Sequence, residues 1–336
     1  MIGIGLESPG VDWIWKDPDW SYPKIRDFWV EAENFGFDTV CTTDNIVWYG
    51  EATHEPMKVY EAWTLLAGLA EATNRIRLGP MMTPCGRRHP ALLAKMAATV
   101  DEITGGRLNL GVGPGDIKSH FNLWGMEFPP VRERIDRLRE ELDILKLLLS
   151  SQELEVSYAG EYYSLSSAPT VPKPVQKPHP PIWMGLVFGT QRMPNLIAEY
   201  ADAVDIYNGS DRAAKDLLAI LASRCKEVGR DFDSLKKARR VYVMMSEDAK
   251  QIPAIDQELN LTLEEQKRRL QAAEDPDLVY GKLGMRCVAG TPDQVAEELC
   301  RILDMGFDHL VLAYLDTLPA LELFAKKVMP SLRAHQ

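Results

Sequence analysis

Short apolar runs alternate with longer amphipathic segments along almost the whole chain. In the segments between the runs, apolar positions recur every three or four residues, which is the spacing of a helix packed on a sheet. The apolar runs predict eight strands: Ile2–Leu6, Thr39–Thr42, Ile76–Met82, Leu108–Val112, Ile182–Leu186, Ala203–Tyr207, Arg240–Met245 and His309–Ala313. Because parallel strands need crossovers of this length, eight strand–helix units favour a (β/α)8 TIM barrel, with a doubly wound open sheet as the alternative.

Two of the predicted helices have clear signals. The fourth linking helix carries one apolar stripe, and the charged run RERIDRLREE is expected to form its solvated face. The stripe consists of Ile135, Leu138, Leu142, Leu145 and Leu149. Another helix is expected over residues 90–104, because Pro90 suits the first helical turn and Gly105 follows its end.

Two longer stretches interrupt the alternation. Residues 151–181 contain a predicted hairpin, EVSYAGEYYSL, followed by the proline-rich segment PTVPKPVQKPHPP. Residues 246–286 are polar and are expected to be mostly helical. Neither stretch is apolar enough for a core of its own, so we expect one barrel domain over residues 1–336 with two insertions.

The composition narrows the class of ligand. The net charge is −11 and the pI is about 5.2, and no long Lys/Arg run offers a surface for nucleic acid or an anionic membrane. We therefore expect a small-molecule substrate. Five scattered cysteines without a Cys-x-x-Cys pair fit reduced thiols and predict no metal site. With neither a signal-peptide pattern nor eighteen consecutive apolar residues, the expected location is the cytoplasm.

In a (β/α)8 barrel the ligand lies at the carboxyl ends of the strands, so residues just beyond each predicted strand are candidates. The polar candidates for catalysis are Glu7, Asp44 and Asn45. The candidates for cofactor binding are Met81, Met82, Thr83, Gly113, Gly115, Asp116, Gly185, Leu186, Gly189, Thr190 and Gln191. For several of them a structural role is the competing interpretation: a cap for Asp44, core packing for the methionines and a surface position for Glu7.

The stretch RLNLGVGPGD is a strand that runs into three glycines and an aspartate. Its Gly-x-Gly-x-Gly spacing differs from the Gly-x-Gly-x-x-Gly of dinucleotide-binding folds, and no acidic residue ends a strand about twenty residues later. The glycines therefore serve either a tight strand-to-helix turn or the close approach of a planar ring or its phosphate tail.

Several segments together resemble the bacterial luciferase-like superfamily of flavin and deazaflavin oxidoreductases. They are GIGLE, TTDN, the block from TNRIRLGPMMT to GGRLNLGVGPGD, PPIWMGLVFGTQR and GTPDQVAEEL with GFDHLVL. Within the superfamily the chain is most similar to methylenetetrahydromethanopterin reductase and its relatives, which use the 5-deazaflavin coenzyme F420, whereas other members use FMN and oxygen. The resemblance implies an oxidoreductase with F420 as cofactor and FMN as the alternative.

The resemblance also assigns positions. Asp44 and Asn45 stand where the family has Asp-His beside the reacting ring, so the histidine is absent here. Met81-Met82 stands where the family carries a non-prolyl cis peptide against the central ring. Gly185 to Gln191 match the loop whose backbone holds the cofactor's phosphate, with Thr190, Gln191 or Arg192 replacing the family's frequent lysine. Glu7 matches a carboxylate that points into the pocket.

Other features leave more than one interpretation. Arg87, Arg88 and His89 would suit an anionic substrate, although His89 before Pro90 also suits a helix start. The aromatic residues near the expected rim fit a substrate lid or a protein contact equally; they are Trp13, Trp15, Trp20, Trp48, Tyr49 and Trp124. The apolar helix faces LLAGLAEAT and LLAKMAATV predict a homodimer. An FMN-dependent monooxygenase and a non-catalytic ligand-binding relative remain the rival functions.

Overall fold

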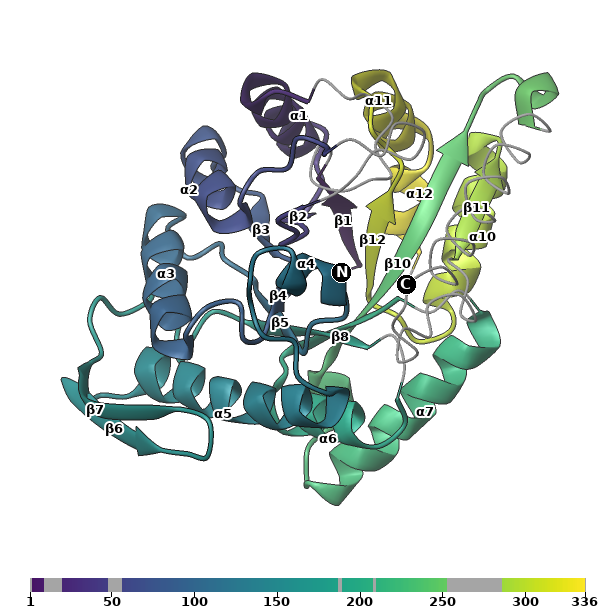
Figure 1. Cartoon of the computed structure of the whole chain (residues 1–336). Helices are drawn as coiled ribbons and strands as arrows, with labels where there is room; N and C mark the ends of the chain where they lie inside the picture. The colour runs from purple at the N-terminus through teal and green to yellow at the C-terminus, as the bar shows by residue number, and fades with distance from the viewer. Residues whose placement is uncertain are drawn as a thin grey trace.

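The structure, a computed structural model, describes residues 2–8, 20–47, 56–186, 189–207, 210–252 and 286–335. Its main sheet is parallel and curls into a barrel with the helices outside (Figure 1). The strands are β1 (Gly3–Glu7), β2 (Thr39–Thr42), β3 (Arg77–Pro80), β4 (Thr83–Pro84), β5 (Leu110–Gly113), β6 (Glu155–Ala159), β7 (Ser164–Pro169), β8 (Ile182–Leu186), β9 (Ala203–Ile206), β10 (Lys236–Met245), β11 (Cys287–Gly290) and β12 (His309–Ala313).

The strand order of the main sheet is β3-β2-β1-β12-β10-β9-β8-β5-β4. Its two ends meet, because a parallel bridge pairs Leu78 in β3 with Leu108 just before β5. The prediction of a (β/α)8 barrel is therefore confirmed, and the open sheet is wrong. The predicted strand Ile76–Met82 is shorter than expected, because β3 ends at Pro80, and the separate strand β4 begins at Thr83 after the two methionines.

Strand β11 was not predicted. Residues 236–239 of β10 pair with β9, and residues 242–245 of the same strand pair with β11 instead. The long strand β10 thus outruns β9, and β11 satisfies the backbone groups that β9 no longer reaches. The expected helical character of residues 246–286 concerns a segment of which residues 246–252 and 286 are described, and these include the short 3-10 turn Ala249–Gln251.

The helices cover the outer face of the barrel. They are α1 (Tyr22–Asn34), α2 (Ala62–Ala72), α3 (Pro90–Ile103), α4 (Lys118–Asn122), α5 (Val131–Ser150), α6 (Arg192–Tyr200), α7 (Asp211–Glu227), α10 (Pro292–Leu303), α11 (Leu318–Lys327) and α12 (Met329–Ala334). A second 3-10 turn covers Phe232–Ser234. None of the described helices combines the length and apolarity needed to span a bilayer.

Helix α5 matches the predicted apolar stripe, with one correction. Leu138, Leu142 and Leu145 are fully buried, but the charged run does not form a purely solvated face. Arg134 and Glu141 from that run are buried as well. Arg134 donates to the carbonyl of Pro129 at 2.6 Å. The helix therefore buries two charged side chains that its polar sequence gave no reason to place inside.

The first insertion forms the predicted hairpin. Strands β6 and β7 pair antiparallel as a separate two-stranded sheet beside α5 (Figure 1). Glu140 of α5 accepts hydrogen bonds from the backbone N–H groups of Glu161, Tyr162 and Tyr163 in the hairpin turn, at 2.6 to 3.0 Å. These bonds fix the hairpin to the barrel wall.

Small residues line much of the barrel interior. A Cβ built on Gly3 would lie 2.0 Å from Nδ1 of His309, and one on Gly5 would lie 2.1 Å from Oγ1 of Thr39. The side chains of β2 and β12 therefore occupy the space beside β1. A buried apolar cluster fills the rest of this level; its members are Met81, Trp183, Ala203, Ala238 and Val311. The barrel is packed at this level and open to a ligand only beyond the strand ends.

Candidate active site

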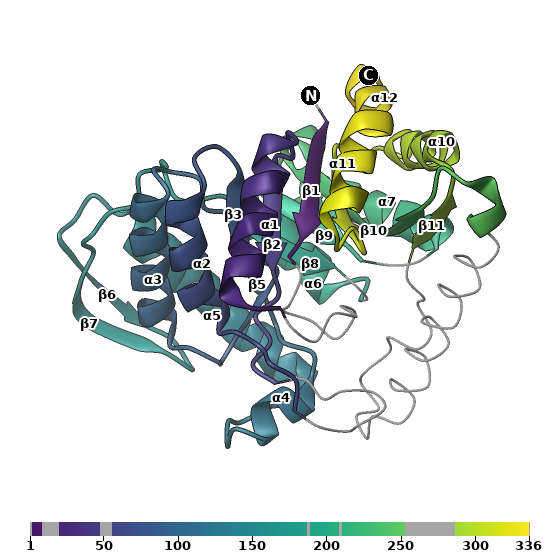
Figure 2. The same ribbon diagram turned by 90° about the horizontal axis from the view of Figure 1, so that it is seen from above.

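The carboxyl ends of the barrel strands all lie at one end of the molecule, which we call the mouth. Figure 2 shows α4 at this end and both chain termini at the opposite end. The sequence predicted Glu7, Asp44, Gly113 and Gly185 as mouth residues, and they close or follow β1, β2, β5 and β8. Parallel strands thus bring residues that are far apart in sequence to one rim.

The peptide bond between Met81 and Met82 is cis, as predicted. The Met82 side chain lies against two mouth glycines: a Cβ on Gly113 would sit 3.5 Å from Met82 Cβ, and one on Gly185 would sit 3.6 Å from Met82 Cγ. Gly111 is closer still, since its Cβ would be 2.9 Å from the Met82 sulfur. These glycines make room for Met82, so part of the space expected for a flat ring is filled by the protein itself.

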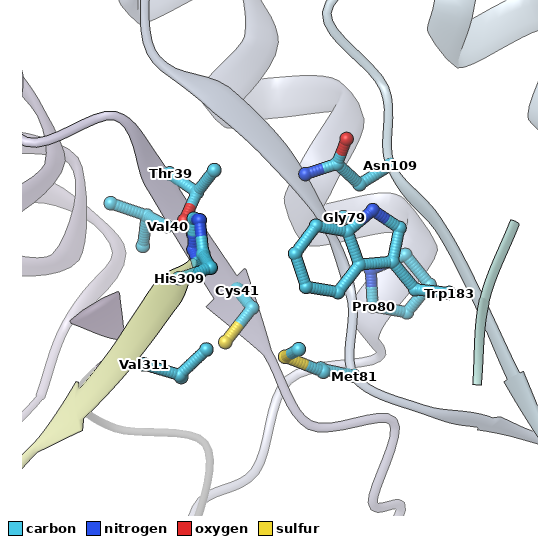
Figure 3. Close-up of a pocket in the computed structure, with 10 residues that line it drawn as sticks. All are labelled: Thr39, Val40, Cys41, Gly79, Pro80, Met81, Asn109, Trp183, His309 and Val311. Carbon is cyan, nitrogen blue, oxygen red and sulfur yellow. Dashed lines mark hydrogen bonds between the residues drawn. The ribbon is translucent and has the colours of Figure 1, made fainter. Parts of the chain in front are cut away.

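A small cavity of about 20 Å³ lies inside the barrel next to Met81. Figure 3 shows the side chains of Trp183, Cys41 and Met81 converging on it. His309 at its edge packs edge-to-face on Trp183, with ring centroids 5.3 Å apart. The cavity holds no more than a water molecule. A cofactor belongs at the mouth, outside this packed level.

Thr83 and Gly115 have structural roles beside the mouth. The indole N–H of Trp63 in α2 donates to the Thr83 hydroxyl at 2.9 Å, so the Thr83 side chain faces α2. The predicted cofactor contact of Thr83 stays a prediction. Gly115 has φ of 75°, and a Cβ there would lie 3.3 Å from Cβ of Pro84. The turn explanation therefore accounts for this glycine.

Asp44 is the centre of a buried ion-pair cluster. Arg88 holds its carboxylate with Nη1 at 2.5 Å from Oδ2 and Nη2 at 3.1 Å from Oδ1, and also contacts Glu61. Arg87 donates to the Asp44 backbone carbonyl and lies 3.6 Å from its carboxylate. The charges of the two arginines are matched by carboxylates of this chain, and their role toward an anionic substrate stays a prediction. Asn45 follows, half-buried at the mouth.

Residues after β5 extend the same cluster. Asp116 is half-buried and its charge acts on Arg87. His120 in α4 is buried, and burial together with the Arg87 charge lowers its pKa to about 4. The imidazole is therefore neutral at neutral pH. His89 caps α3, since its Nδ1 accepts from the Ala91 N–H at 3.2 Å, so the helix-start interpretation of this residue is confirmed.

Across the mouth, one guanidinium joins two carboxylates. Nη1 of Arg240 lies 3.2 Å from Oε1 of Glu7, and Nη2 lies 2.8 Å from Oδ2 of Asp205. All three side chains are buried, with residue exposures of 9%, 2% and 2% for Arg240, Glu7 and Asp205. The Arg240 guanidinium also stacks over the Tyr207 ring, 4.8 Å from its centroid. Sequence analysis found Glu7 but missed its partners, which lie within apolar strand runs.

Burial controls the ionisation of this group. It raises the pKa of Glu7, against the opposing effect of Arg240 and with the help of Asp205. Burial also raises the pKa of the Cys41 thiol and of the Tyr242 phenol, which lie beside the same charges. The Tyr242 hydroxyl is 2.5 Å from that of Tyr207. The Cys41 thiol and the Tyr242 phenol are therefore neutral hydrogen-bonding groups close to the Arg240 cation.

The loop after β8 leads to the start of α6. Leu186 is buried in the outer core, so its side chain does not reach the mouth. Gly189 has φ of 90°, and a Cβ there would meet nothing within 4 Å. Thr190 and Gln191 are exposed at the start of α6. Arg192 contacts Asp136 and the Arg132 carbonyl on α5, and its part in phosphate binding stays a prediction.

The predicted aromatic rim is described only in part. Trp13, Trp15, Trp48 and Tyr49 lie outside the described residues. Trp20 packs edge-to-face on Phe28 of α1, with centroids 6.1 Å apart, which is a core contact. Trp124 after α4 is 59% exposed. Within the described ranges, no three His, Cys, Asp or Glu side chains gather as a metal site.

The sequence matches one family along most of its length. The family described as "Luciferase-like monooxygenase" matches residues 9–309. A curated relative, the F420-dependent glucose-6-phosphate dehydrogenase of Microbacterium testaceum (strain StLB037), is 30% identical over 328 residues. That alignment covers 92% of this chain and 93% of the relative. The similarity is therefore not confined to the glycine-rich block.

This chain shares its fold with solved structures of an F420-dependent reductase and of a monooxygenase. The coenzyme F420-dependent tetrahydromethanopterin reductase from Methanopyrus kandleri superposes with a TM-score of 0.75 at 23% identity, covering 98% of this chain and 99% of that one. The EDTA monooxygenase from Chelativorans sp. BNC1 superposes with a TM-score of 0.81 at 16% identity, covering 99% and 94%. The fold alone does not separate the two classes.

Proposed function

We propose that this chain is an F420-dependent enzyme. It belongs to the bacterial luciferase-like family of oxidoreductases. It would bind the deazaflavin at the mouth of the barrel and act on a small organic alcohol or carbonyl compound. The observation that carries this proposal is the 30% identity to an F420-dependent dehydrogenase across 92% of the chain. Fold similarity extends equally to a monooxygenase and does not decide the cofactor.

The mouth residues fit a flat, phosphorylated cofactor. Gly113 and Gly185 leave the wall of β5 and β8 without side chains, and Met82 offers an apolar surface beside them. The open Gly189 position and the exposed backbone of Thr190 and Gln191 precede α6, and N–H groups at a helix start suit a phosphate. Glu7 and Asp205 each keep one buried carboxyl oxygen without a partner among the described residues. The site thus offers apolar, anion-binding and polar parts.

The protein would orient the reactants and manage the proton, while the deazaflavin, when bound, supplies the hydride chemistry. Met82 and the two glycines would hold the ring by shape, and the backbone before α6 would hold the phosphate. Glu7 is the mouth group suited to exchange a proton with a substrate oxygen, since its Oε2 has no partner among the described residues, whereas Arg88 holds both oxygens of Asp44. Asn45 carries no titratable group and would serve only as a hydrogen-bond partner.

The substrate belongs to an uncharged class under this proposal. Arg87, Arg88 and Arg240 are the described arginines at the mouth, and each is matched by carboxylates of the same chain. A sugar phosphate, as in the name of the relative from Microbacterium, would find these cations engaged. The FMN-dependent monooxygenase stays the rival function.

The test is turnover with reduced or oxidised F420, followed by the absorbance of the coenzyme. A panel of small uncharged alcohols and ketones is compared with glucose 6-phosphate. The proposal predicts coenzyme-dependent turnover with at least one uncharged compound. Oxygen consumption with reduced FMN, and no turnover with F420, would favour the monooxygenase. Binding of F420 without turnover of any compound would favour a ligand-binding relative.

A further inference from the structure

The mouth contains a cluster of three charged groups with an uneven charge count. Arg240 contributes one positive charge, and Glu7 and Asp205 would contribute two negative charges if both were ionised. Each carboxyl presents one oxygen to the guanidinium. The other oxygens, Oε2 of Glu7 and Oδ1 of Asp205, are buried and have no hydrogen-bond partner among the described residues. A net charge of −1 at such a site is costly unless one carboxyl keeps a proton.

The groups around Glu7 do not supply the missing positive charge. Strand β2 contributes the Cys41 thiol, and β10 contributes the Tyr242 phenol next to Arg240. Burial raises the pKa of both groups, so both are neutral at neutral pH. After β9 comes Tyr207, whose ring lies under the Arg240 guanidinium. Arg240 is therefore the cation that both carboxyls share. Two carboxylates close to one site repel each other, so one of the two carboxyls keeps its proton to higher pH than the other.

We propose that Arg240 and Asp205 position Glu7 and keep one proton on it, so that Glu7 gives this proton to the oxygen of a carbonyl substrate. The proposal rests on the proposed function, which it extends by naming the reaction direction and the residues that control it. Arg240 fixes one Glu7 oxygen at 3.2 Å and leaves the other for the substrate. Asp205 neutralises Arg240, so that this cation does not force Glu7 to ionise.

The step balances as the reduction of a carbonyl group. When bound, the reduced deazaflavin of the proposed function would supply a hydride, with both electrons, to the carbonyl carbon. The C–O π electrons move to oxygen, and this oxygen takes the proton of Glu7. The products are an alcohol, oxidised coenzyme and the Glu7 carboxylate, which pairs with Arg240. Solvent returns a proton to Glu7 before the next turnover.

Two substitutions with opposite electrostatic effects test the proposal. Asp205→Asn removes the negative charge that favours the protonated acid, so ionisation of Glu7 should begin at lower pH. Arg240→Gln removes the cation, so ionisation should begin at higher pH. The carbonyl reduction rate should fall at alkaline pH in the wild type. This fall should move down by about one pH unit in the first variant and up by about one unit in the second. Arg240→Lys should return it toward the wild-type position.

Infrared spectroscopy of the protein without cofactor gives a readout that needs no activity. At neutral pH the wild type should show the C=O stretching band of a protonated carboxyl, and Glu7→Gln should lack this band. The pH at which half of the band has disappeared should be lower in Asp205→Asn and higher in Arg240→Gln than in the wild type. Glu141→Gln identifies any band from that second buried acid. Arg239→Lys is the matched control, because Arg239 is buried on the same strand and donates to the Ile206 carbonyl, and the lysine keeps the positive charge that acts on Asp205. It should move neither the band nor the pH profile.

The outcomes distinguish a failure of the inference about the Glu7 proton from a failure of the proposed F420-dependent function. A Glu7 band with opposite shifts supports the inference about the proton even if no F420 activity is found, in which case the proposed function fails. A wild type without the Glu7 band, or variants that change the rate without moving the pH profile in opposite directions, would overturn the inference. If Arg240→Gln does not fold, the other two variants test the inference. The pH at which the band and the rate fall should be lower in Asp205→Asn and close to the wild-type value in Arg240→Lys.

Discussion

Arg88 donates hydrogen bonds from both terminal nitrogens to the Asp44 carboxylate, at 2.5 Å to one oxygen and 3.1 Å to the other. The Asp44 side chain is fully buried and that of Arg88 is 11% exposed. Asp44 lies two residues beyond the end of β2, and Arg88 lies in the loop between β4 and α3, so the pair joins two parts of the rim. A carboxylate held in this way anchors the mouth and is poorly suited to exchange protons.

The first prediction concerns this anchor. Asp44→Asn leaves Arg87 and Arg88 partly unpaired in a buried site, so the free energy of unfolding should fall by about 3 kcal/mol. Urea denaturation of the protein without cofactor measures it. Asp27→Asn is the control, since Asp27 pairs with Arg26 on the surface and its loss should cost less than about 1 kcal/mol. Equal effects of the two substitutions would show that Asp44 is not a structural anchor.

A second prediction follows from His309. Burial lowers its pKa to about 3 from 6.5, so the folded protein keeps it neutral where the unfolded chain is protonated. Its stabilising contribution is present above pH 6.5 and is lost as the pH falls toward 3, by on the order of 1 kcal/mol per pH unit. His309→Gln should flatten this part of the stability curve. A variant with the wild-type slope between pH 6.5 and 4 would contradict the assignment.

Glu141 should act with the opposite sign. Burial raises its pKa to about 8 from 4.5, against the effects of Cys85 and the Gly86 backbone. Stability from this group is complete below pH 4.5 and is lost as the pH rises through 8, because ionisation would place an unpaired charge inside the protein. The stability of Glu141→Gln relative to the wild type should therefore be greater at pH 8 than at pH 5. Thermal unfolding at the two pH values measures the difference.

The fourth prediction tests the phosphate loop. Gly189→Ala places a side chain at φ of 90° in the proposed N–H cradle and should weaken cofactor binding by about 1–3 kcal/mol. Gly229→Ala is the matched control, because Gly229 has φ of 74° with nothing within 4 Å of its Cβ but lies beyond α7. If both variants bind the cofactor as the wild type does, the phosphate lies elsewhere.

The barrel could be predicted from the sequence because the pattern that indicates each strand is contained in a few neighbouring residues. Apolar runs such as Ile182–Leu186 and His309–Ala313 became strands with the predicted bounds, since strands buried on both faces need continuous apolar sequence. The run Cys287–Gly290 was not predicted, and it forms a strand where β10 extends past β9 and leaves a place to pair.

The polar partners of the site were beyond sequence reasoning for a different reason. Glu7 and Arg240 are 233 positions apart, and Arg240 and Asp205 are 35 apart. Both partners lie inside strands, where the pattern indicates only a buried face. Which charges meet across the mouth depends on the strand order around the barrel, and one sequence does not carry that information. The role of Glu141 as a buried acid was hidden by its charged neighbours on α5 in the same way.

The central claim is that this family member binds a deazaflavin in preference to a flavin. The most direct measurement is a titration of the protein without cofactor against F420 and against FMN, by thermal unfolding and by fluorescence, because a ligand that binds only the folded state raises the unfolding temperature. The account predicts tighter binding and the larger thermal shift with F420. Tighter binding of FMN would contradict it.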